Sequence, residues 1–320
     1  MIQTKWVIER LHRQWPDLEI TIEPIRTTGD QITHVPLSQI GGDGVFVTEI
    51  ERALHERRID LAVHSLKDLP TAQPDGLQVV VVGPREDVRD IFVSNKLFKI
   101  SNGHLQPMIY DAELERSPRI GTCSLRRSAQ IREFCPGAHI LPLRGNVDTR
   151  LRKLESGEYD GIVLAAAGLH RLALQHHLAE RLIYFPVEMM LPAPGQGALG
   201  LEIRDEPEMQ ALLAPLRDVV VQAATTAERM FMRRLGAGCY LPIAAHAEVV
   251  DGKLALHGLV ISLDGQRRIR VHQSIHWNAD DVIAGAEALG ISLAEQALDR
   301  GAHEIIRDID ILRNREQQRV

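Results

Sequence analysis

The sequence predicts an α/β protein of two lobes, followed by an α+β domain that contains a small antiparallel sheet. Up to about residue 215, short apolar runs alternate with amphipathic segments, which is typical of sheets covered by helices. Two segments rich in Pro, Gly and charged residues, 84–90 and 191–197, interrupt this pattern. The chain is therefore expected to pass from the first lobe to the second and back. After residue 217 the pattern changes to a long helix and strands of period two.

The apolar runs of the two lobes are bounded by turn residues. They predict strands at 19–25, 61–63, 77–82, 91–94, 140–143, 161–165 and 198–203. Helical periodicity predicts helices at 48–58, 124–134, 147–154 and 169–178. The first of these begins with a capping box formed by Thr48 and Glu51. Residues 95–117 have weak periodicity and are expected to form a surface excursion.

The C-terminal third of the chain has a different character. A helix at 219–235 precedes predicted strands at 244–250, 253–262 and 267–275, with Asp251-Gly252 and Asp264-Gly265 as hairpin turns. A last helix is expected at 292–309, opened by a capping box of Ser292 and Glu295. The predicted domains are 1–84 with 196–216 for lobe one, 85–195 for lobe two, and 217–320 for a C-terminal domain.

Composition and charge argue against several classes of function. Lys and Arg number 37 against 43 Asp and Glu, and this net charge of −6 argues against a general affinity for nucleic acid. No apolar run approaches the roughly 20 residues of a membrane span, and no basic segment precedes an apolar core at the N-terminus. A cytoplasmic protein is expected. The three cysteines are too widely spaced for a disulfide framework or a zinc site, so no metal is expected.

Two predicted strand-to-helix junctions in the second lobe, GTCSLRR (121–127) and LRGNVDTR (143–150), favour an anion site. The N-terminus of a helix offers unpaired N–H groups, and polar and basic side chains surround both turns. These side chains are Thr122, Ser124, Asn146, Arg126, Arg127, Arg144 and Arg150. A ligand with several carboxylates or phosphates would suit them. The alternative is that the arginines form ordinary surface ion pairs.

Two further positions have residue types that suit catalysis. Lys67 and Asp68 follow the strand in AVHSLKDLP (62–70), where a carboxylate can stabilise a developing cation if the cleft excludes water. Such a pair is more often a solvated turn. Cys239 lies between Gly238 and Tyr240 just after the long predicted helix, in a loop that a ligand can approach closely because of Gly236 and Gly238. Its alternative is a half-buried structural thiol.

Taken together and in this order, these segments resemble the porphobilinogen deaminase family. The four most specific motifs are AVHSLKDLP, GTCSLRR, LRGNVDTR and GAGCYLP (236–242). The match continues through IGGDGVF (40–46), LPAPGQGALGLE (191–202) and AERMFMRRL (227–235). The resemblance implies two lobes like those of periplasmic binding proteins, with doubly wound mixed sheets, and a small third domain.

The resemblance also implies a reaction. A dipyrromethane cofactor would be joined through a thioether to Cys239, and four porphobilinogen units would be added to it with loss of ammonia before hydrolysis releases hydroxymethylbilane. Asp68 would hydrogen-bond pyrrole N–H groups and stabilise the cationic azafulvenium. The residues implied to hold the carboxylates of cofactor and substrate are Lys67, Thr122, Ser124, Arg126, Arg127, Arg144, Asn146 and Arg150. Gln196 and Gly197 would form the lobe-crossing turn near the cofactor.

Three departures from the family's pattern bear on activity. Gln39 and Asp43 stand where the family commonly has lysines in a loop over the cleft, and Cys123 replaces a serine. The family begins with a strand and turn that carry active-site Arg and Ser residues, whereas Met1 aligns with the helix that follows. The first strand of lobe one is therefore expected to be missing. The chain as given is then expected to be poorly folded in that lobe or nearly inactive.

The expected partners are porphobilinogen and the growing polypyrrole, with no nucleic acid and no membrane, and the protein is expected to be a monomer. Two alternatives stay open at this point. One is a deaminase relative that is inactive or truncated. The other is a non-catalytic two-lobe protein that binds a polycarboxylate, for which the anion-binding turns would suffice and Cys239 and Asp68 would be incidental.

Overall fold

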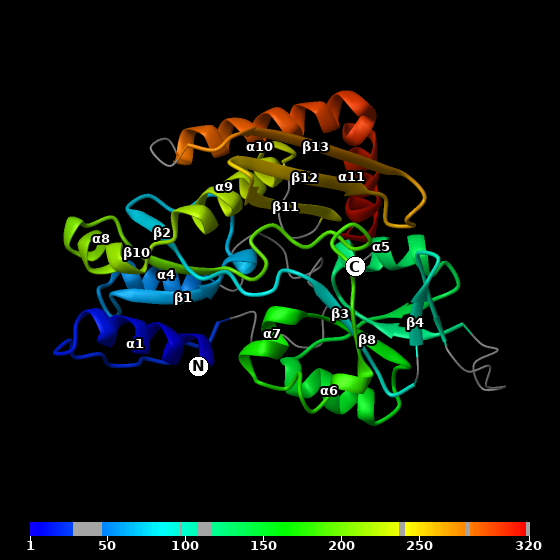
Figure 1. Cartoon of the computed structure of the whole chain (residues 1–320), viewed down its shortest axis with the longest axis horizontal. Coiled ribbons are helices and arrows are strands. Elements are labelled where there is room, and N and C mark those ends of the chain that lie inside the picture. The colour runs from blue at the N-terminus through cyan, green and yellow to red at the C-terminus, as the bar shows by residue number, and fades with distance from the viewer. Residues whose placement is uncertain (28–46, 97, 108–116, 237–240, 279–281, 318–320) are drawn as a thin grey trace.

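Three sheets with separate cores, and one short hairpin, make up the described part of the chain (Figure 1). The structure is a computed structural model, and it describes residues 1–27, 47–96, 98–107, 117–236, 241–278 and 282–317. Two of the sheets lie side by side in the lower part of Figure 1, and the third lies above them. The domain boundaries expected from the sequence stay a prediction.

Lobe one is built on a three-stranded sheet in the order β1-β10-β2, in which both pairings are antiparallel. Helices α1 and α8 pack against one face of the sheet, since buried Val7 and Leu11 of α1 share a core cluster with Leu201. Helix α4 lies on the other face. The bounds are α1 Ile2–Gln14, α4 Thr48–His55, β1 Leu61–Ser65, β2 Leu77–Val82, β10 Leu199–Arg204 and α8 Pro207–Leu213.

The prediction of a strand at residues 19–25 is wrong. This segment has no regular secondary structure, although Ile20 packs against the core of lobe one. A strand needs a neighbour to hydrogen-bond with, and within the described residues β1 pairs only with β10. The apolar residues of this segment suggested a strand, but only the partly buried Ile20 packs on the core, and the segment has no pairing partner among the described residues.

Lobe two contains a five-stranded mixed sheet in the order β7-β6-β8-β3-β9, which confirms the mixed sheet expected there. Its β3 strand alternates faces: Ile91 and Val93 pack against α6 and α7, and Phe92 packs against α5. Helices therefore cover both faces. The bounds are β3 Asp90–Ser94, β6 Arg119–Gly121, α5 Leu125–Phe134, β7 His139–Leu141, α6 Val147–Glu155, β8 Gly161–Ala165, α7 Ala166–Arg171 and β9 Leu182–Tyr184.

Two expectations for lobe two need correction. The helix predicted at 169–178 begins earlier and ends at Arg171, and Ala173 then adopts a positive φ of 55° that a helix cannot continue through. The surface excursion contains a β-hairpin of β4 (Phe98–Ser101) and β5 (His104–Pro107). Its turn is Asn102-Gly103, and both residues have positive φ, as a type I′ turn requires.

The third domain packs a three-stranded antiparallel sheet, β11-β12-β13, against α9 and α10, as expected. Asp251 and Gly252 form the first hairpin turn, with φ values of 50° and 70°. The bounds are α9 Val219–Arg234, β11 Ile243–Val250, β12 Lys253–Ile261, β13 Arg268–His276, α10 Val282–Ala297 and α11 His303–Gln317.

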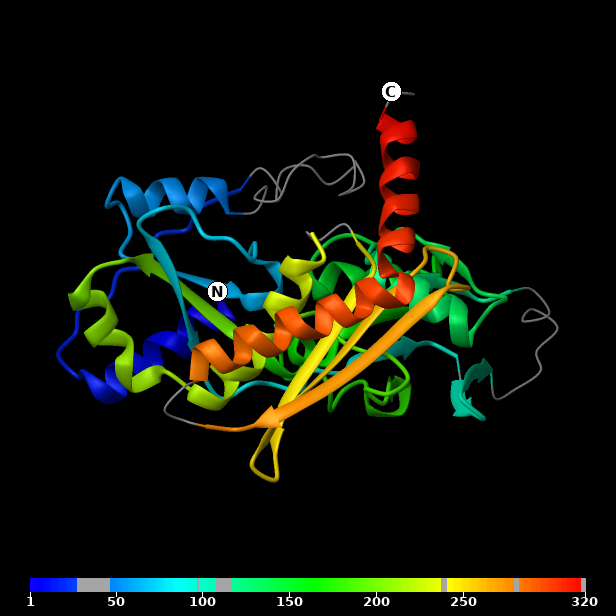
Figure 2. The same cartoon turned by 90° about the horizontal axis from the view of Figure 1, so that it is seen from above.

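The single last helix expected at 292–309 is two helices. Ser292 lies inside α10, where its hydroxyl donates to Gln273 and caps nothing. Gly301 has a φ of 98° and breaks the helical path between α10 and α11. Figure 2 shows α11 extending away from the other described elements.

Candidate functional site

The turn after β1 presents Lys67 and Asp68 at the edge of lobe one. Both lie on a short 3-10 turn (Leu66–Asp68) that is anchored by fully buried Leu66. Arg229 of α9 donates to the carbonyl oxygens of Leu66, Leu69 and Pro70. The Asp68 side chain is exposed and Lys67 is half-buried. The carboxylate thus projects from a turn that the third domain holds in place.

The second crossing between the lobes places Gln196 at the centre of the site. Its fully buried amide nitrogen donates to the carbonyl oxygen of Val88 at 2.7 Å and to Asp90 Oδ1 at 3.0 Å. Its amide oxygen accepts from Lys67 Nζ at 3.3 Å. The Gln196 side chain therefore contacts both the turn after β1 in lobe one and the first strand of lobe two.

The next residue has to be glycine. Gly197 has a φ of 88°, and a Cβ there would lie 2.3 Å from the carbonyl oxygen of Glu86 on the other crossing. Its own carbonyl accepts from the backbone N–H of Glu86 at 3.1 Å and from Arg171 Nη2 at 2.8 Å. The two crossings can approach this closely because residue 197 has no side chain.

The GTCSLRR junction forms the N-terminus of α5, as predicted. Ser124 is the N-cap, and its hydroxyl oxygen accepts from the backbone N–H of Arg127. Thr122 is buried, and its Oγ1 accepts from the backbone N–H of Ser124 at 3.2 Å. Both hydroxyls therefore order the turn that carries the two arginines.

The guanidinium groups of Arg126 and Arg127 are buried and share one carboxylate, that of Asp90. Arg126 Nη1 lies 2.6 Å from Oδ2, and Arg127 Nε and Nη2 lie 3.0 and 2.7 Å from Oδ1. Burial opposes the charge on Asp90, but the two arginines hold the pKa of this carboxyl well below its ordinary range. Asp90 was not singled out in the sequence. In the sequence it ends the charged segment 84–90, and only its burial at the start of β3 shows that it requires a charged partner.

The LRGNVDTR junction forms the N-terminus of α6. Asn146 is the exposed N-cap, and its Oδ1 accepts from the backbone N–H of Thr149 at 2.9 Å. Arg150 is half-buried and donates from Nε to the carbonyl oxygen of Gly145 at 2.7 Å. Arg144 is also half-buried. Asn146 thus has a structural role at this turn, and the two arginines flank it.

Electrostatic interactions show which of these side chains the fold brings together. The pKa of the Lys67 amine is lowered to about 8, chiefly by burial. The positive charges of Arg126 and Arg127 lower this pKa further, whereas the negative charges of Asp68 and Asp90 raise it. Burial also lowers the pKa of Arg150, which interacts with Arg127 and Arg144 and, across the lobes, with Asp68. The carboxylate cluster, as we call it, consists of Lys67, Asp68, Asp90, Arg126, Arg127, Arg144, Arg150 and Gln196.

Some predicted positions lie outside the described residues. These are Cys239, Gln39 and Asp43. The described cysteines, Cys123 and Cys135, are free thiols. Within the described residues no group of His, Cys, Asp or Glu has the arrangement of a metal site, and no helix is long and apolar enough to cross a membrane.

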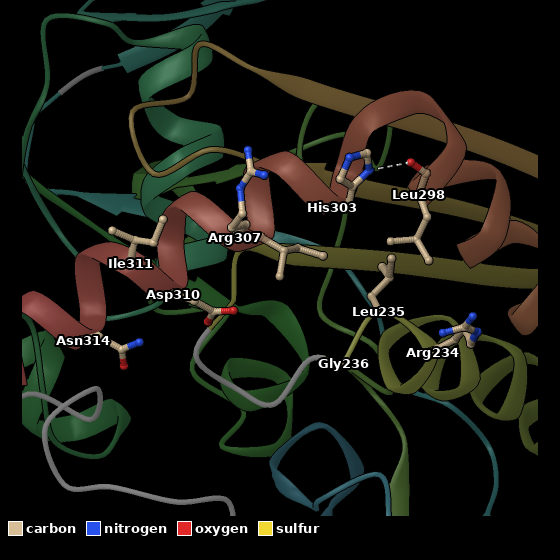
Figure 3. A pocket seen from close by; sticks show the side chains of 10 residues that line it. Arg234, Leu235, Gly236, Leu298, His303, Arg307, Asp310, Ile311 and Asn314 are labelled. Carbon is tan, nitrogen blue, oxygen red and sulfur yellow. Dashed lines mark hydrogen bonds between the residues drawn. The ribbon is translucent and has the colours of Figure 1, made fainter.

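A surface pocket of about 450 Å³ lies away from the carboxylate cluster, between the end of α9 and α11 (Figure 3). Leu235, Leu298 and Ile306 contribute apolar side chains, and His303 Nδ1 donates to the carbonyl oxygen of Leu298 at 3.0 Å. Gly236 is one of the residues that line the pocket, and none of the predicted site residues lines it.

Two family models match the chain in sequence order. The one described as "Porphobilinogen deaminase, dipyromethane cofactor binding domain" matches residues 1–211, and "Porphobilinogen deaminase, C-terminal domain" matches residues 222–299. The chain belongs to the porphobilinogen deaminase family. The resemblance of the motifs is thereby confirmed, and with it the family's dipyrromethane cofactor.

Relatives within the family span almost the whole chain. Porphobilinogen deaminase of Syntrophotalea carbinolica is 46% identical over 312 residues, which cover 97% of this chain and 92% of that protein. The enzyme named likewise in Syntrophobacter fumaroxidans is 44% identical over 296 residues, covering 92% and 89%. Among solved structures, an ancestral cationic amino acid solute-binding protein covers 66% of this chain and 76% of its own, with 15% identity and a TM-score of 0.37.

Proposed function

We propose that this chain joins four porphobilinogen units head to tail, with loss of ammonia, into hydroxymethylbilane on a dipyrromethane primer. The observation that supports this most directly is the carboxylate cluster. Four arginines and one lysine from both lobes interact with one another, with buried Asp90 and with exposed Asp68, in a member of the porphobilinogen deaminase family. Every pyrrole of substrate and product carries an acetate and a propionate, so the ligand is a polyanion.

The residues present fit the dipyrromethane cofactor. Its carboxylates require charged donors in a shielded place, and arginine provides them in a planar fork. Arg126 is 5% exposed, and its buried Nε has no hydrogen-bond partner among the described residues. A buried charged N–H group without a partner is costly, and a ligand carboxylate would satisfy it. The residues proposed to hold the cofactor are Lys67, Thr122, Ser124, Arg126, Arg127, Arg144, Gln196 and Gly197, with attachment at Cys239.

The substrate is proposed to bind beside the cofactor, at Arg150, Arg126 and Asn146. When bound, the cofactor supplies the free pyrrole carbon to which the first substrate unit is joined. Asp68 is proposed to stabilise the positive charge that develops on the substrate as its amine leaves as ammonia. A fixed carboxylate inside a closed site stabilises such a cation better than reorienting water does. The turn of Asp68 is fixed by Arg229, and its exposed carboxylate is open to a substrate, which would shield it from water when bound.

The proposal extends to the location and the oligomeric state of the protein. The net charge of −6 and the clustering of the arginines at two turns fit a small polyanionic ligand better than a nucleic acid. We propose that the protein is cytoplasmic and acts as a monomer. Size-exclusion chromatography with light scattering measures the second point directly.

The experiment that tests the function is mass spectrometry of the intact purified protein, combined with an assay for hydroxymethylbilane. The expected mass exceeds that of the chain by two substrate units less their ammonia. Cys239→Ala should lack the adduct and the activity, whereas Cys123→Ser, the matched control at a half-exposed thiol, should keep both. A bare mass with no product would contradict the proposal. It would favour an inactive relative, or a binding protein if porphobilinogen still binds.

A further inference from the structure

We propose that Asp90 is a positioning residue of the carboxylate cluster, which orients Arg126 toward the ligand, anchors Arg127 and joins both arginines to Gln196 at the lobe crossing. This inference rests on the proposed function, because it assumes that the cluster binds the carboxylates of the pyrrole chain. It assigns a role to a buried carboxylate that touches neither the proposed ligand nor solvent.

Four hydrogen bonds from three side chains converge on Asp90. Arg126 donates to Oδ2, while Arg127 donates twice to Oδ1, which also accepts from Gln196 Nε2 at 3.0 Å. The residue is fully buried at the start of β3. Both oxygens are occupied, so each guanidinium has one position that satisfies the carboxylate.

The two arginines differ in how many of their guanidinium nitrogens have a protein partner. Arg127 also donates from Nη1 to the carbonyl oxygen of Val163 at 3.2 Å, so each of its three nitrogens has a protein partner. Arg126 Nη1 donates to Asp90 and to the carbonyl oxygen of Leu191 at 2.8 Å, which leaves its buried Nε without a partner among the described residues. Asp90 and Leu191 therefore fix Arg126 through Nη1, which leaves Nε and Nη2 as the donors for a ligand, while Arg127 anchors the turn.

The charge of Asp90 acts on Lys67 as well. The groups that face the Lys67 amine are Asp68, Asp90, Arg126, Arg127 and the amide of Gln196. Asp90 raises the pKa of this amine, against the lowering effect of burial and of both arginines, and the net result is a pKa of about 8. Neutralising Asp90 should lower the pKa of Lys67 further, so that a smaller fraction of the amine is charged at neutral pH.

A purely structural role for Asp90 would predict only loss of stability, so the test needs a matched buried carboxylate. Asp160 is 2% exposed and pairs with Arg119 and Lys96 in the same lobe. It precedes β8, whereas Asp90 pairs with Ala165 at the other end of that strand. Five residues of strand separate the two positions by roughly 16 Å. Asp160→Asn thus removes a comparable carboxylate far from the cluster.

The first measurement needs no cofactor: competitive acetylation of Lys67 is followed across pH by peptide mass spectrometry in the purified full chain. The wild type should show a midpoint near pH 8. Asp90→Asn should lower the midpoint by about one, which is a tenfold change in the equilibrium at fixed pH. Asp160→Asn should keep it, whatever its stability. An unchanged midpoint in Asp90→Asn, or equal shifts in both variants, would overturn the electrostatic part of the proposal.

Asp90→Glu separates charge from position and avoids an uncompensated buried charge. It should keep the midpoint of Lys67, because the charge remains, but displace both guanidiniums by its longer stem. The fraction of purified protein that carries the cofactor adduct should then fall at least about tenfold, equivalent to about 1.4 kcal/mol. Full loading in Asp90→Glu would overturn the positioning role. A wild type without any adduct would refute the proposed function instead, and the acetylation result would still stand.

Discussion

Glu228 and Arg85 form a buried bidentate ion pair, in which Nη1 and Nη2 lie 2.8 and 2.9 Å from the two carboxylate oxygens. Glu228 belongs to α9 of the third domain, and Arg85 lies on the first lobe crossing. The same carboxylate accepts from the backbone N–H of Gly195 on the second crossing at 2.7 Å and from that of Ala247 at 2.8 Å. One side chain of the third domain therefore holds both crossings.

Replacing Glu228 by Gln should destabilise the protein strongly. Glu228 is fully buried, and its loss leaves the Arg85 guanidinium without its counter-ion, which costs about 3–5 kcal/mol. Urea unfolding measures this cost. The control is Glu295→Gln, which breaks the exposed pair with Arg234 and should cost less than about 1 kcal/mol. Equal costs would mean that the buried pair contributes nothing beyond a surface one.

The same carboxylate should make stability depend on acid pH. Burial alone would raise the pKa of Glu228, but Arg85 and His246 lower it to about 2. The unfolded value is about 4.3, so this stabilisation is complete above about pH 5 and is lost as the pH falls toward about 2, by about 3 kcal/mol in all. Urea midpoints between neutral and acid pH should fall less steeply in Glu228→Gln than in wild type. Parallel curves would contradict the assignment.

The close approach of the two crossings predicts a cost for any side chain at residue 197. Gly197→Ala combines a positive φ of 88° with a Cβ that would lie 2.3 Å from a backbone oxygen. The control is Gly157→Ala, with a φ of 79° and nothing within 4 Å of the new Cβ. Both variants carry left-handed strain of about 1–2 kcal/mol, and Gly197→Ala should lose about 1–3 kcal/mol more. Thermal unfolding compares them, and equal losses would exclude the steric explanation.

Local signals in the sequence predicted the local parts of the site well. The helix starts predicted at GTCSLRR and LRGNVDTR are those of α5 and α6, and the structure adds that Ser124 and Asn146 are their N-caps, since a helix start depends on a few neighbouring residues. The capping-box pattern at Ser292 failed, since the residues before it are also helical and no helix begins there. The segment at 19–25 failed for a different reason: strand pairing depends on distant residues that periodicity does not report.

The sequence could not assign Asp90, because its partners Arg126 and Arg127 are 36 and 37 residues away. In the sequence, Asp90 is the last residue of the charged segment 84–90 between the lobes, and a carboxylate in such a segment is ordinarily exposed to solvent. Only the fold shows that this segment enters the core. The arginines were predicted to face a ligand, and the structure places a protein carboxylate among them, which is what suggests a positioning role.

Asp68→Asn should keep the fold and lose most of the activity. An exposed turn residue contributes little to stability, so the far-ultraviolet circular dichroism and the urea midpoint should match those of wild type. The amide is nearly isosteric but carries no charge, and it cannot stabilise a cation that develops when ammonia leaves. The loss should be at least about 2.7 kcal/mol of transition-state stabilisation, roughly a hundredfold in kcat. Asp75→Asn, which changes another exposed aspartate in the following turn, should stay within about twofold of wild type, well under 1 kcal/mol. Turnover of Asp68→Asn at the level of this control would remove Asp68 from the chemistry and leave the carboxylate cluster as a binding site only.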